Sequence, residues 1–241
     1  MEEKISNYIS ILNGKPADEI IRFFGKEFPG EVAFATSLGA EDQVLFEMIS
    51  KTDPSVHVFT LDTGRLFPET YDLMDISEKK YGMKIKVMFP DAASIQKMVS
   101  EHGINLFFDS IENRKLCCRI RKVEPMLKAL KGMKVWITGL RRSQSENRKN
   151  TPMVEWDDTY GLIKVNPLFD WSEDQVWEYL RSHKIPYNTL HDKGFRSIGC
   201  QPCTRAVLPG EDLRAGRWWW EESGKKECGI HLRKNGLPSQ G

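Results

Sequence analysis

The sequence contains no run of about 20 apolar residues, which is the length that a membrane-spanning helix needs. Its first residues, Met1 to Lys4, lack the basic and then apolar layout of a secretory signal peptide. Charge of one sign is not in excess either, because 35 Lys and Arg residues stand against 34 Asp and Glu residues. Such a balance gives no reason to expect a nucleic-acid or an anionic-membrane partner. We therefore expect a cytoplasmic protein with neither kind of partner.

Cysteine is scarce, with five residues in 241. A chain of this length buries roughly 70% of its unfolded surface and needs no disulfides for stability. In a reducing compartment, five cysteines are better explained as metal ligands or reactive thiols than as disulfides. They could also be small buried hydrophobic side chains, but their spacing argues against that interpretation.

Short apolar, β-prone segments alternate with segments of helical periodicity along most of the chain. The expected strands are 31–37, 56–61, 84–89 and 134–140. The expected helices are 16–28, 43–49, 68–81, 94–102, 113–131 with a possible kink at Pro125, and one capped by Ser172 that runs to about His183. This alternation predicts an α/β fold with a doubly wound, mostly parallel sheet.

The character of the chain changes after about residue 208. Residues 209–241 are polar, rich in Gly, Lys and Glu, and show weak periodicity apart from three consecutive tryptophans at 218–220. We expect residues 1–208 to form the α/β domain and residues 209–241 to form a mobile tail with one aromatic anchor.

Four of the cysteines form two close pairs. Cys117 and Cys118 are adjacent, and Cys200 and Cys203 are separated by two residues. Two pairs that meet in a fold make a four-thiolate site, which suits zinc or an iron–sulfur cluster. Adjacent cysteines are awkward ligands for one small ion, so the spacing favours a cluster over zinc. A redox dithiol at Cys200 and Cys203 is the alternative, but it leaves the other pair unexplained.

The fifth cysteine, Cys228, lies alone in the polar tail. Lys225, Lys226 and His231 favour its thiolate, whereas Glu227 opposes it. Local chemistry leaves two interpretations open, an incidental thiol and a nucleophile carried on a movable segment.

Three of the expected strands end in loops with Gly, Arg or hydroxyl residues. Ligands in open α/β sheets bind beyond the carboxyl ends of the strands, so these loops should face one crevice. None of them is a Walker motif or a G-x-G-x-x-G fingerprint, and each alone is equally well explained as a tight turn or a solvated charge. Together they predict an anion and nucleotide site that includes Ser37, Gly39, Ala40, Leu61, Thr63, Gly64, Gly139, Arg141 and Arg142.

Three further cations are candidates for the same site. Arg214 and Arg217 are three residues apart and could jointly bind a dianion. Lys122 follows Cys118 by four residues, so on a helix the two would share a face.

At this point the sequence resembles the assimilatory sulfonucleotide reductases. The resemblance rests on residues 37–42 (SLGAED), 61–65 (LDTGR), the Cys117-Cys118-x-x-Arg121-Lys122 segment, the Gly139-x-Arg141-Arg142-x-Gln144-Ser145 segment, the Cys200-x-x-Cys203 pair and residues 226–231 (KECGIH). It covers about residues 30 to 232. Because all five cysteines are present, the chain is similar to the cluster-bearing branch that acts on adenylyl sulfate (APS), some members of which also accept phosphoadenylyl sulfate (PAPS).

The resemblance implies a fold like that of the adenine-nucleotide alpha-hydrolases and a two-step reaction. Cys228 attacks the sulfur of APS and AMP leaves; thioredoxin or a similar dithiol then releases sulfite from the S-sulfocysteine. One 4Fe-4S cluster per chain is implied, with Cys117, Cys118, Cys200 and Cys203 as ligands. His231 is implied as a supporting residue of the catalytic tail, and the loop residues, Lys122, Arg214 and Arg217 as the substrate site. We also expect a homo-oligomer.

Two rival functions are less compatible with the residues. An ATP-pyrophosphatase-type adenylylating enzyme prefers a Ser-Gly-Gly-x-Asp-Ser loop, whereas this chain has Ser37-Leu38-Gly39-Ala40-Glu41-Asp42. An enzyme of that type would also not need Cys228. A non-catalytic zinc or cluster module that senses redox state would not need three anion-binding strand ends.

Overall fold

A six-stranded, mostly parallel sheet forms the centre of the molecule. The computed structural model describes residues 1–221 and Ile230. In spatial order the strands are β3 (Lys86–Met88), β2 (His57–Leu61), β1 (Val32–Ala35), β4 (Val135–Ile137), β6 (Leu162–Val165) and β5 (Val154–Asp157). All neighbouring pairs are parallel except β5 and β6, which form an antiparallel hairpin. The predicted mostly parallel, doubly wound sheet is confirmed.

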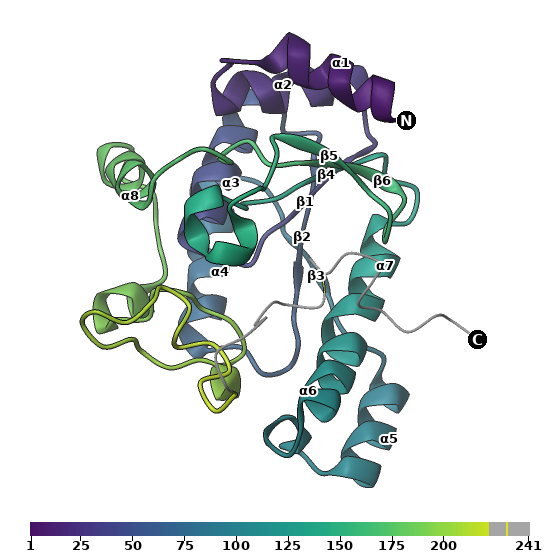
Figure 1. Cartoon of the computed structure of the whole chain (residues 1–241), viewed down its shortest axis with the longest axis vertical. Helices are drawn as coiled ribbons and strands as arrows, with labels where there is room; N and C mark the ends of the chain where they lie inside the picture. The colour runs from purple at the N-terminus through teal and green to yellow at the C-terminus, as the bar shows by residue number, and fades with distance from the viewer. Residues whose placement is uncertain (222–229, 231–241) are drawn as a thin grey trace.

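Helices cover both faces of this sheet. Figure 1 shows α3, α4 and α8 on one side and α5, α6 and α7 on the other, with α1 and α2 beyond the end of the sheet. Their bounds are α1 Glu2–Leu12, α2 Ala17–Glu27, α3 Ala40–Thr52, α4 Pro68–Tyr81, α5 Ala92–His102, α6 Ile111–Cys118, α7 Glu124–Leu130 and α8 Glu173–Ser182. Short 3-10 turns occupy Leu106–Phe108, Arg142–Gln144, Glu146–Arg148, Thr189–Lys193 and Gln201–Cys203. Apolar side chains of the sheet and of α1, α2, α3, α4 and α8 make the main core, among them Phe24, Phe34, Phe46 and Ile49.

Helix ends follow the local sequence signals closely. Helix α4 begins at Pro68, whose missing N–H costs nothing in a first turn, and is followed by Gly82 in the left-handed conformation (φ 65°). Helix α8 begins after Ser172, whose hydroxyl accepts a hydrogen bond from the backbone N–H of Gln175 at 3.1 Å. The Gln175 side chain accepts from the Ser172 N–H at 2.7 Å and completes a capping box.

The long helix expected over 113–131 is divided. Helix α6 passes into a wider π-helical turn at Arg119–Val123, and α7 then begins with Pro125 in its first turn. Proline cannot donate to the helical ladder, which explains why the regular helix is interrupted just before it. The widened turn carries Arg121 and Lys122 directly after the adjacent cysteines.

Helix α1 and the β5–β6 hairpin were not predicted. Only Tyr8 and Leu12 of α1 are buried, so the sequence carries a weak apolar stripe there. The hairpin turns at Asp157–Gly161, where the Asp157 carboxylate accepts hydrogen bonds from the N–H groups of Thr159 and Tyr160. The left-handed Gly161 (φ 67°) closes this turn, a signal that the sequence does contain.

The first part of the expected tail is packed onto the domain. Trp218 is 1% exposed, and Trp220 lies against Phe107 and Phe108 with ring centroids 6.2 and 4.5 Å apart. A tryptophan run therefore anchors residues 209–221, whereas 222–229 and 231–241 lie outside the described residues. The mobility expected of the tail stays a prediction.

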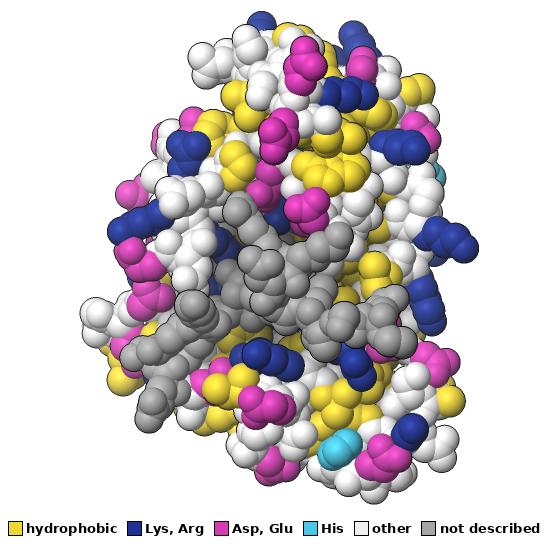
Figure 2. All heavy atoms as spheres, turned by 45° about the vertical axis from the view of Figure 1, so that its right-hand side comes forward, with side chains coloured by type: hydrophobic (Ala, Val, Ile, Leu, Met, Phe, Trp, Pro, Cys, Tyr) yellow, Lys and Arg dark blue, Asp and Glu magenta, His cyan; other side chains and the backbone are white. Residues whose placement is uncertain are grey.

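Charge is mixed on the surface. On the face that Figure 2 shows, acidic and basic side chains alternate without a broad area of one sign. Among the residues that the structure describes, no helix combines the length and the hydropathy needed to cross a bilayer.

We predict that Phe24→Ala destabilises the fold by about 3–5 kcal/mol, because it empties a fully buried position. Phe24 also makes an edge-to-face contact with Tyr8 of α1, with ring centroids 5.3 Å apart. Urea denaturation measures the effect, with Ile11→Ala as the control because Ile11 is 48% exposed. Equal midpoints for the two variants would contradict the packing of α1 and α2 described here.

Candidate functional site

A cavity of about 510 Å³ lies where the order of the sheet reverses. Strands β2 and β3 lie on one side of β1, and β4, β6 and β5 lie on the other. The chain therefore leaves the carboxyl ends of β1 and β4 in different directions and opens a crevice between them, which is where ligands bind in such sheets. Residues from the ends of β1, β2 and β4 line the cavity.

The loops after β1 and β4 are built by the same local device. The Thr36 hydroxyl accepts a hydrogen bond from the Leu38 N–H at 3.0 Å, and the Thr138 hydroxyl accepts one from the Leu140 N–H at 3.3 Å. Each threonine thus turns the chain sharply at the end of its strand. The two turns expose backbone groups at the floor of the cavity.

The β1–α3 loop is held in one conformation. Asp42 Oδ2 accepts hydrogen bonds from both the backbone N–H and the hydroxyl of Ser37, each at 2.6 Å. Leu38 is buried with a left-handed φ of 60°, and Gly39 precedes the first turn of α3. Gly39 and Ala40, at the N-terminus of α3, line the cavity, and the positive end of the helix dipole there favours an anion.

Asp42 lies deep behind this loop, and its environment disfavours the carboxylate. Burial raises the pKa of Asp42 to about 6, although the hydrogen bonds from Ser37 act in the opposite direction. A Cβ added at Gly139 would overlap Asp42 Oδ1, so only glycine allows the β4 loop to approach so closely.

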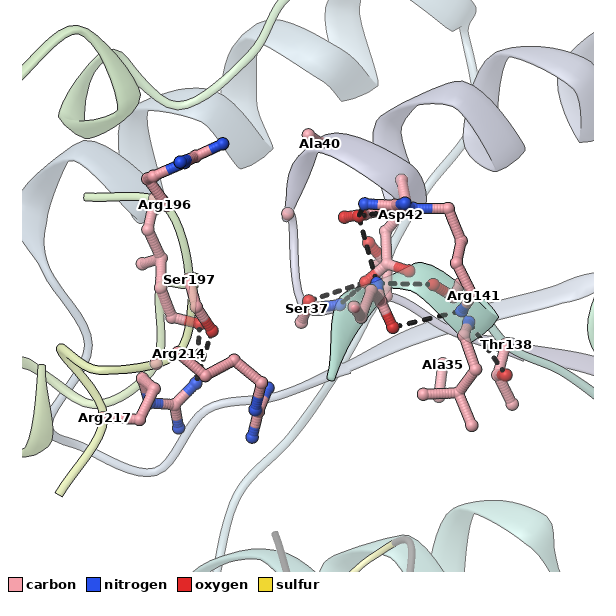
Figure 3. A pocket seen from close by; sticks show the side chains of 18 of the residues that line it. Ala35, Ser37, Ala40, Asp42, Thr138, Arg141, Arg196, Ser197, Arg214 and Arg217 are labelled. Carbon is pink, nitrogen blue, oxygen red and sulfur yellow. Dashed lines mark hydrogen bonds and ion pairs between the residues drawn. The ribbon is translucent and has the colours of Figure 1, made fainter. Parts of the chain in front are cut away.

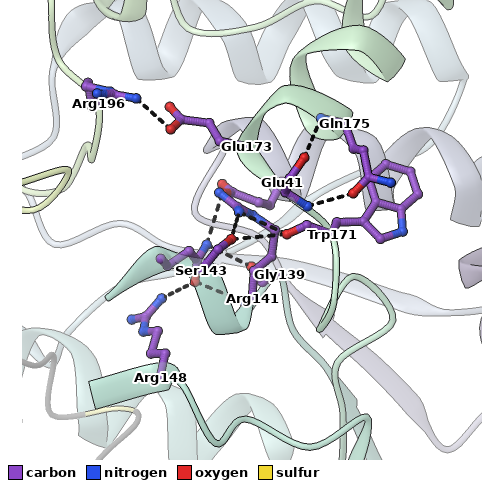
Figure 4. A network of polar contacts seen from close by, with 11 residues as sticks. Glu41, Gly139, Arg141, Ser143, Arg148, Trp171, Glu173, Gln175 and Arg196 are labelled. Atoms are coloured by element: carbon purple, nitrogen blue, oxygen red, sulfur yellow. Dashed lines mark hydrogen bonds and ion pairs between the residues drawn. The ribbon is translucent and has the colours of Figure 1, made fainter. Parts of the chain in front are cut away.

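Glu41 and Arg141 form an ion pair between the two loops, at the centre of the network in Figure 4. Arg141 Nη2 and Nε lie 2.7 and 2.9 Å from Glu41 Oε1, and Gln144 Nε2 donates to the same oxygen at 3.0 Å. Burial alone would raise the pKa of Glu41, but the Arg141 charge and the hydrogen bonds hold it below its ordinary value. Arg141 lines the cavity, but the Glu41 carboxylate neutralises its charge. The role of Arg141 is therefore to hold the loops after β1 and β4 together.

Three arginines, Arg196, Arg214 and Arg217, lie on the wall of the cavity that faces the β1–α3 loop. Figure 3 shows Arg214, Arg217, Arg196 and Ser197 facing Ser37, Asp42 and Arg141 across the cavity. Arg196 pairs with Glu173 of α8 at 2.5 Å. Arg217 packs so closely against Gly199 that an added Cβ there would overlap its guanidinium.

Most of the sequence-predicted substrate residues meet in this cavity. Those that line it are Ser37, Gly39, Ala40, Leu61, Thr63, Lys122, Gly139, Arg141, Arg214 and Arg217. Gly64 and Arg142 do not. Gly64 forms the turn beside it (φ 68°), and its N–H donates to Asp62 Oδ1 at 2.7 Å.

Arg142 departs from the role expected of it. Its Nε donates to the Thr151 backbone oxygen at 2.9 Å, and its guanidinium lies over the Phe169 ring, 4.7 Å from the centroid. These contacts hold the Arg142 side chain against Thr151 and Phe169 and away from the cavity. The side chains of Arg141 and Arg142 point in different directions, so only Arg141 lines the cavity.

Sequence reasoning missed several residues of the lining. Thr138, Arg148, His191, Arg196 and Ser197 all line the cavity. Arg148 follows Gln144 by four residues and donates to Gln144 Oε1 at 2.5 Å, a spacing that the sequence shows. Arg196 and Ser197 stand shortly before Cys200, so the position of the cysteine pair could have indicated them.

The four paired cysteines line a second, smaller cavity of about 20 Å³. Cys117 and Cys118 reach it from the end of α6, Cys203 from the 3-10 turn at Gln201–Cys203, and Cys200 from the position just before that turn. All four are free thiols in the structure. Four cations and two ring or apolar residues complete its lining: Arg65, Arg114, Arg121, Lys122, Phe107 and Pro202.

The pKa values of the Cys200 and Cys203 thiols shift in opposite directions. Burial would raise the pKa of Cys200, but Lys122 and a hydrogen bond with Thr63, whose Oγ1 lies 3.3 Å from Cys200 Sγ, lower it below the ordinary thiol value. Burial and the neighbouring Cys200 raise the pKa of Cys203 to about 12. Lys122 lines both cavities and is therefore the charge that they share.

Two observations bear on what else the site contains. Within residues 1–221 and Ile230, no group of three or more His, Cys, Asp or Glu side chains is arranged to hold a metal ion. Cys228 and His231, the predicted catalytic residues, lie outside the described residues. Ile230 is described, and it lines the larger cavity and packs beside Trp136 and Met126.

Comparison with known proteins gives a consistent family. Residues 31–206 match the phosphoadenosine phosphosulfate reductase domain family. A relative named adenosine 5'-phosphosulfate reductase, from Allochromatium vinosum, is 52% identical over 203 residues, which are 84% of this chain and 79% of that protein. The solved phosphoadenylyl-sulfate (PAPS) reductase of Candida auris is similar with a TM-score of 0.74 and 32% identity, over 86% of this chain and 98% of that one. A Candida glabrata FMN adenylyltransferase structure (TM-score 0.54, 15% identity, 95% and 83% covered) shows a shared fold alone.

We predict that Asp42 makes the free energy of unfolding fall as pH rises from about 4 to about 6. Between its ordinary pKa of 3.8 and its folded pKa of about 6, the native state binds more protons than the unfolded state, and stability then decreases with pH. Asp42→Asn removes this titration, so its stability relative to the wild type should rise by about 2–3 kcal/mol across that window. Urea midpoints of both proteins at several pH values test this, and parallel curves would refute it.

Proposed function

Because the chain belongs to the phosphoadenosine phosphosulfate reductase domain family, we propose that it reduces APS to sulfite and AMP in assimilatory sulfate reduction. The observation that carries the proposal is the cavity of about 510 Å³ at the β1–β4 reversal, which has anion-binding groups on both walls. Its volume lies in the range of small-molecule and cofactor sites. The relatives named adenosine 5'-phosphosulfate reductase support APS as the substrate.

The chemistry that we propose is nucleophilic and covalent. The Cys228 thiolate attacks the sulfur of APS, a sulfur–sulfur bond forms, and the bond from that sulfur to the phosphate oxygen of AMP breaks. A thiolate of thioredoxin or a similar dithiol then attacks Cys228 Sγ, and sulfite leaves. The second thiol of that partner closes its disulfide and returns Cys228, so the dithiol supplies both electrons. Ile230 lies at the cavity, two residues after Cys228 in the chain, which supports this role.

The cations of the cavity have distinct tasks in this scheme. Attack of a thiolate on an anionic sulfate group meets charge repulsion, which Lys122, Arg214 and Arg217 offset. The same groups stabilise the phosphate of the leaving AMP. Arg141 acts through its pair with Glu41 by holding the two strand-end loops in place.

We further propose that Cys117, Cys118, Cys200 and Cys203 hold one 4Fe-4S cluster per chain. Four free thiols converge on one small cavity, and the cations beside them suit an anionic thiolate-ligated group. When bound, such a cluster supplies structure and a local electrostatic field.

Three further properties concern the substrate, the cellular location and the oligomeric state. PAPS is a second candidate substrate, because the similar Candida auris structure is named a PAPS reductase. We also propose a cytoplasmic location, where thiols such as these remain reduced. A homo-oligomer remains a prediction.

We predict that Cys228→Ser abolishes sulfite release, since serine cannot form the thiosulfonate. Sulfite release from APS and from PAPS, with thioredoxin and its reductase, measures this. The wild type should also accumulate a sulfite adduct on Cys228, visible by mass spectrometry when the dithiol is omitted. Retained activity in the variant would exclude Cys228 as the nucleophile.

We predict that anaerobically purified protein contains about four iron and four sulfide ions per chain. Cys203→Ser should lower both contents, whereas Cys228→Ser should leave them unchanged because Cys228 is not a ligand. Metal analysis and visible absorbance measure the contents. Zinc in place of iron, without a visible absorption band, would contradict the cluster.

A further inference from the structure

A buried ion pair joins α6 to the start of the tail. Arg114 lies three residues before Cys117, and Glu221 is the last residue of the continuous described chain. Their side chains are only 5% and 8% exposed. Arg114 Nε and Nη2 each donate to one oxygen of the Glu221 carboxylate, the second at 3.1 Å. Arg114 also lines the cysteine cavity, and the proposed attack on APS involves neither Arg114 nor Glu221.

The ion pair forms one side of a stack of three side chains. The Arg114 guanidinium lies 4.7 Å from the centroid of the Trp218 ring, and the Arg217 guanidinium lies 4.8 Å from the same centroid. Trp218 is therefore in contact with a cation from α6 and a cation from the cavity wall, which is a favourable arrangement for an indole ring. The backbone N–H of Trp218 donates to the Cys203 backbone oxygen at 3.2 Å.

The two arginines of this stack differ in their charge balance. The Glu221 carboxylate neutralises Arg114, whereas no carboxylate within residues 1–221 pairs with Arg217. Arg217 contacts neutral groups, the Ile198 backbone oxygen at 3.3 Å and the Ser197 hydroxyl at 3.5 Å. Arg217 lines the nucleotide cavity and its charge also acts on the neighbouring Cys200 and Cys203 thiols. Its position depends on the ring of Trp218 and on the glycine at 199.

We propose that Glu221 is a positioning residue that, through Arg114 and Trp218, holds the Arg217 guanidinium at the nucleotide cavity. The inference rests on the proposed function for the identity of the nucleotide. Glu221 fixes Arg114 in its orientation with two hydrogen bonds, a geometry that a lone charge could not impose. Arg114 then fixes one face of Trp218, and Trp218 fixes Arg217. The same pair fixes the position of Glu221, which lies seven residues before Cys228 in the chain.

Binding of AMP is the first test, because it requires Arg217 but no chemistry. Glu221→Gln keeps the size of the side chain and removes its charge, and we expect the Kd for AMP to rise about tenfold. Glu211→Gln is the matched control, since Glu211 forms a half-buried pair with Arg205 in the same segment and neither residue contacts Trp218. The control should bind AMP as the wild type does. Unchanged AMP affinity in Glu221→Gln would overturn the inference.

A double-mutant cycle separates positioning from general stability. If Glu221 acts through Arg217, then Glu221→Gln should have little further effect on AMP affinity in an Arg217→Ala background. If Glu221 were merely structural, the two effects would multiply, and this result would overturn the inference. The iron content of each variant checks that the cysteine cavity is intact.

A second variant guards against loss of folding, because a single substitution leaves an unpaired buried charge. Replacing both partners, as in Arg114→Leu with Glu221→Leu, is often neutral for stability. The inference expects this folded double variant to show the same loss of AMP affinity. Wild-type affinity would refute it. Should the wild type bind AMP but release no sulfite, the proposed function would fail while the inference about Arg217 stood.

Discussion

The ion pair between Glu41 and Arg141 is the contact on which the shape of the nucleotide cavity depends. It joins the first turn of α3 to the loop after β4, two segments that are 100 residues apart in the chain. Removing water from two charges is costly, so such a pair contributes less to stability than to geometry. Here the geometry is a fixed distance between the two strand ends. The helix N-terminus, the Thr36 and Thr138 turns and the close approach at Gly139 all depend on that distance.

The fold could be predicted where the chain's own periodicity decides the structure. Buried parallel strands are short, continuous apolar runs, and the four strands β1 to β4 were found at nearly their observed positions. Helix α1 and the β5–β6 hairpin were missed because tertiary contacts form them. Tyr8 joins α1 to α2 through aromatic contacts with Phe23 and Phe24, and no local signal shows such a contact.

The candidate site could likewise be predicted only in part. Parallel topology brings the carboxyl ends of strands together, so the loops could be predicted to share one cavity. The side chains that pair with each arginine could not be predicted, because most of them lie far away in the sequence. Arg141 is neutralised by Glu41, Arg142 lies against Phe169, and Arg217 retains its charge for the cavity. Spacing alone treats all three as equivalent.

The two edges of the sheet limit how copies of this chain can associate. Strand β3 is only three residues long and begins with the exposed Lys86, and α1 packs beside β5 at the other edge. Short, charged or covered edges resist the addition of a further strand. Glu155 and Asp157 of β5 are also engaged by the buried Lys164 of β6. Self-association through a continuous intermolecular sheet is thereby disfavoured, which protects the protein from edge-to-edge aggregation and leaves helical and loop surfaces for any assembly.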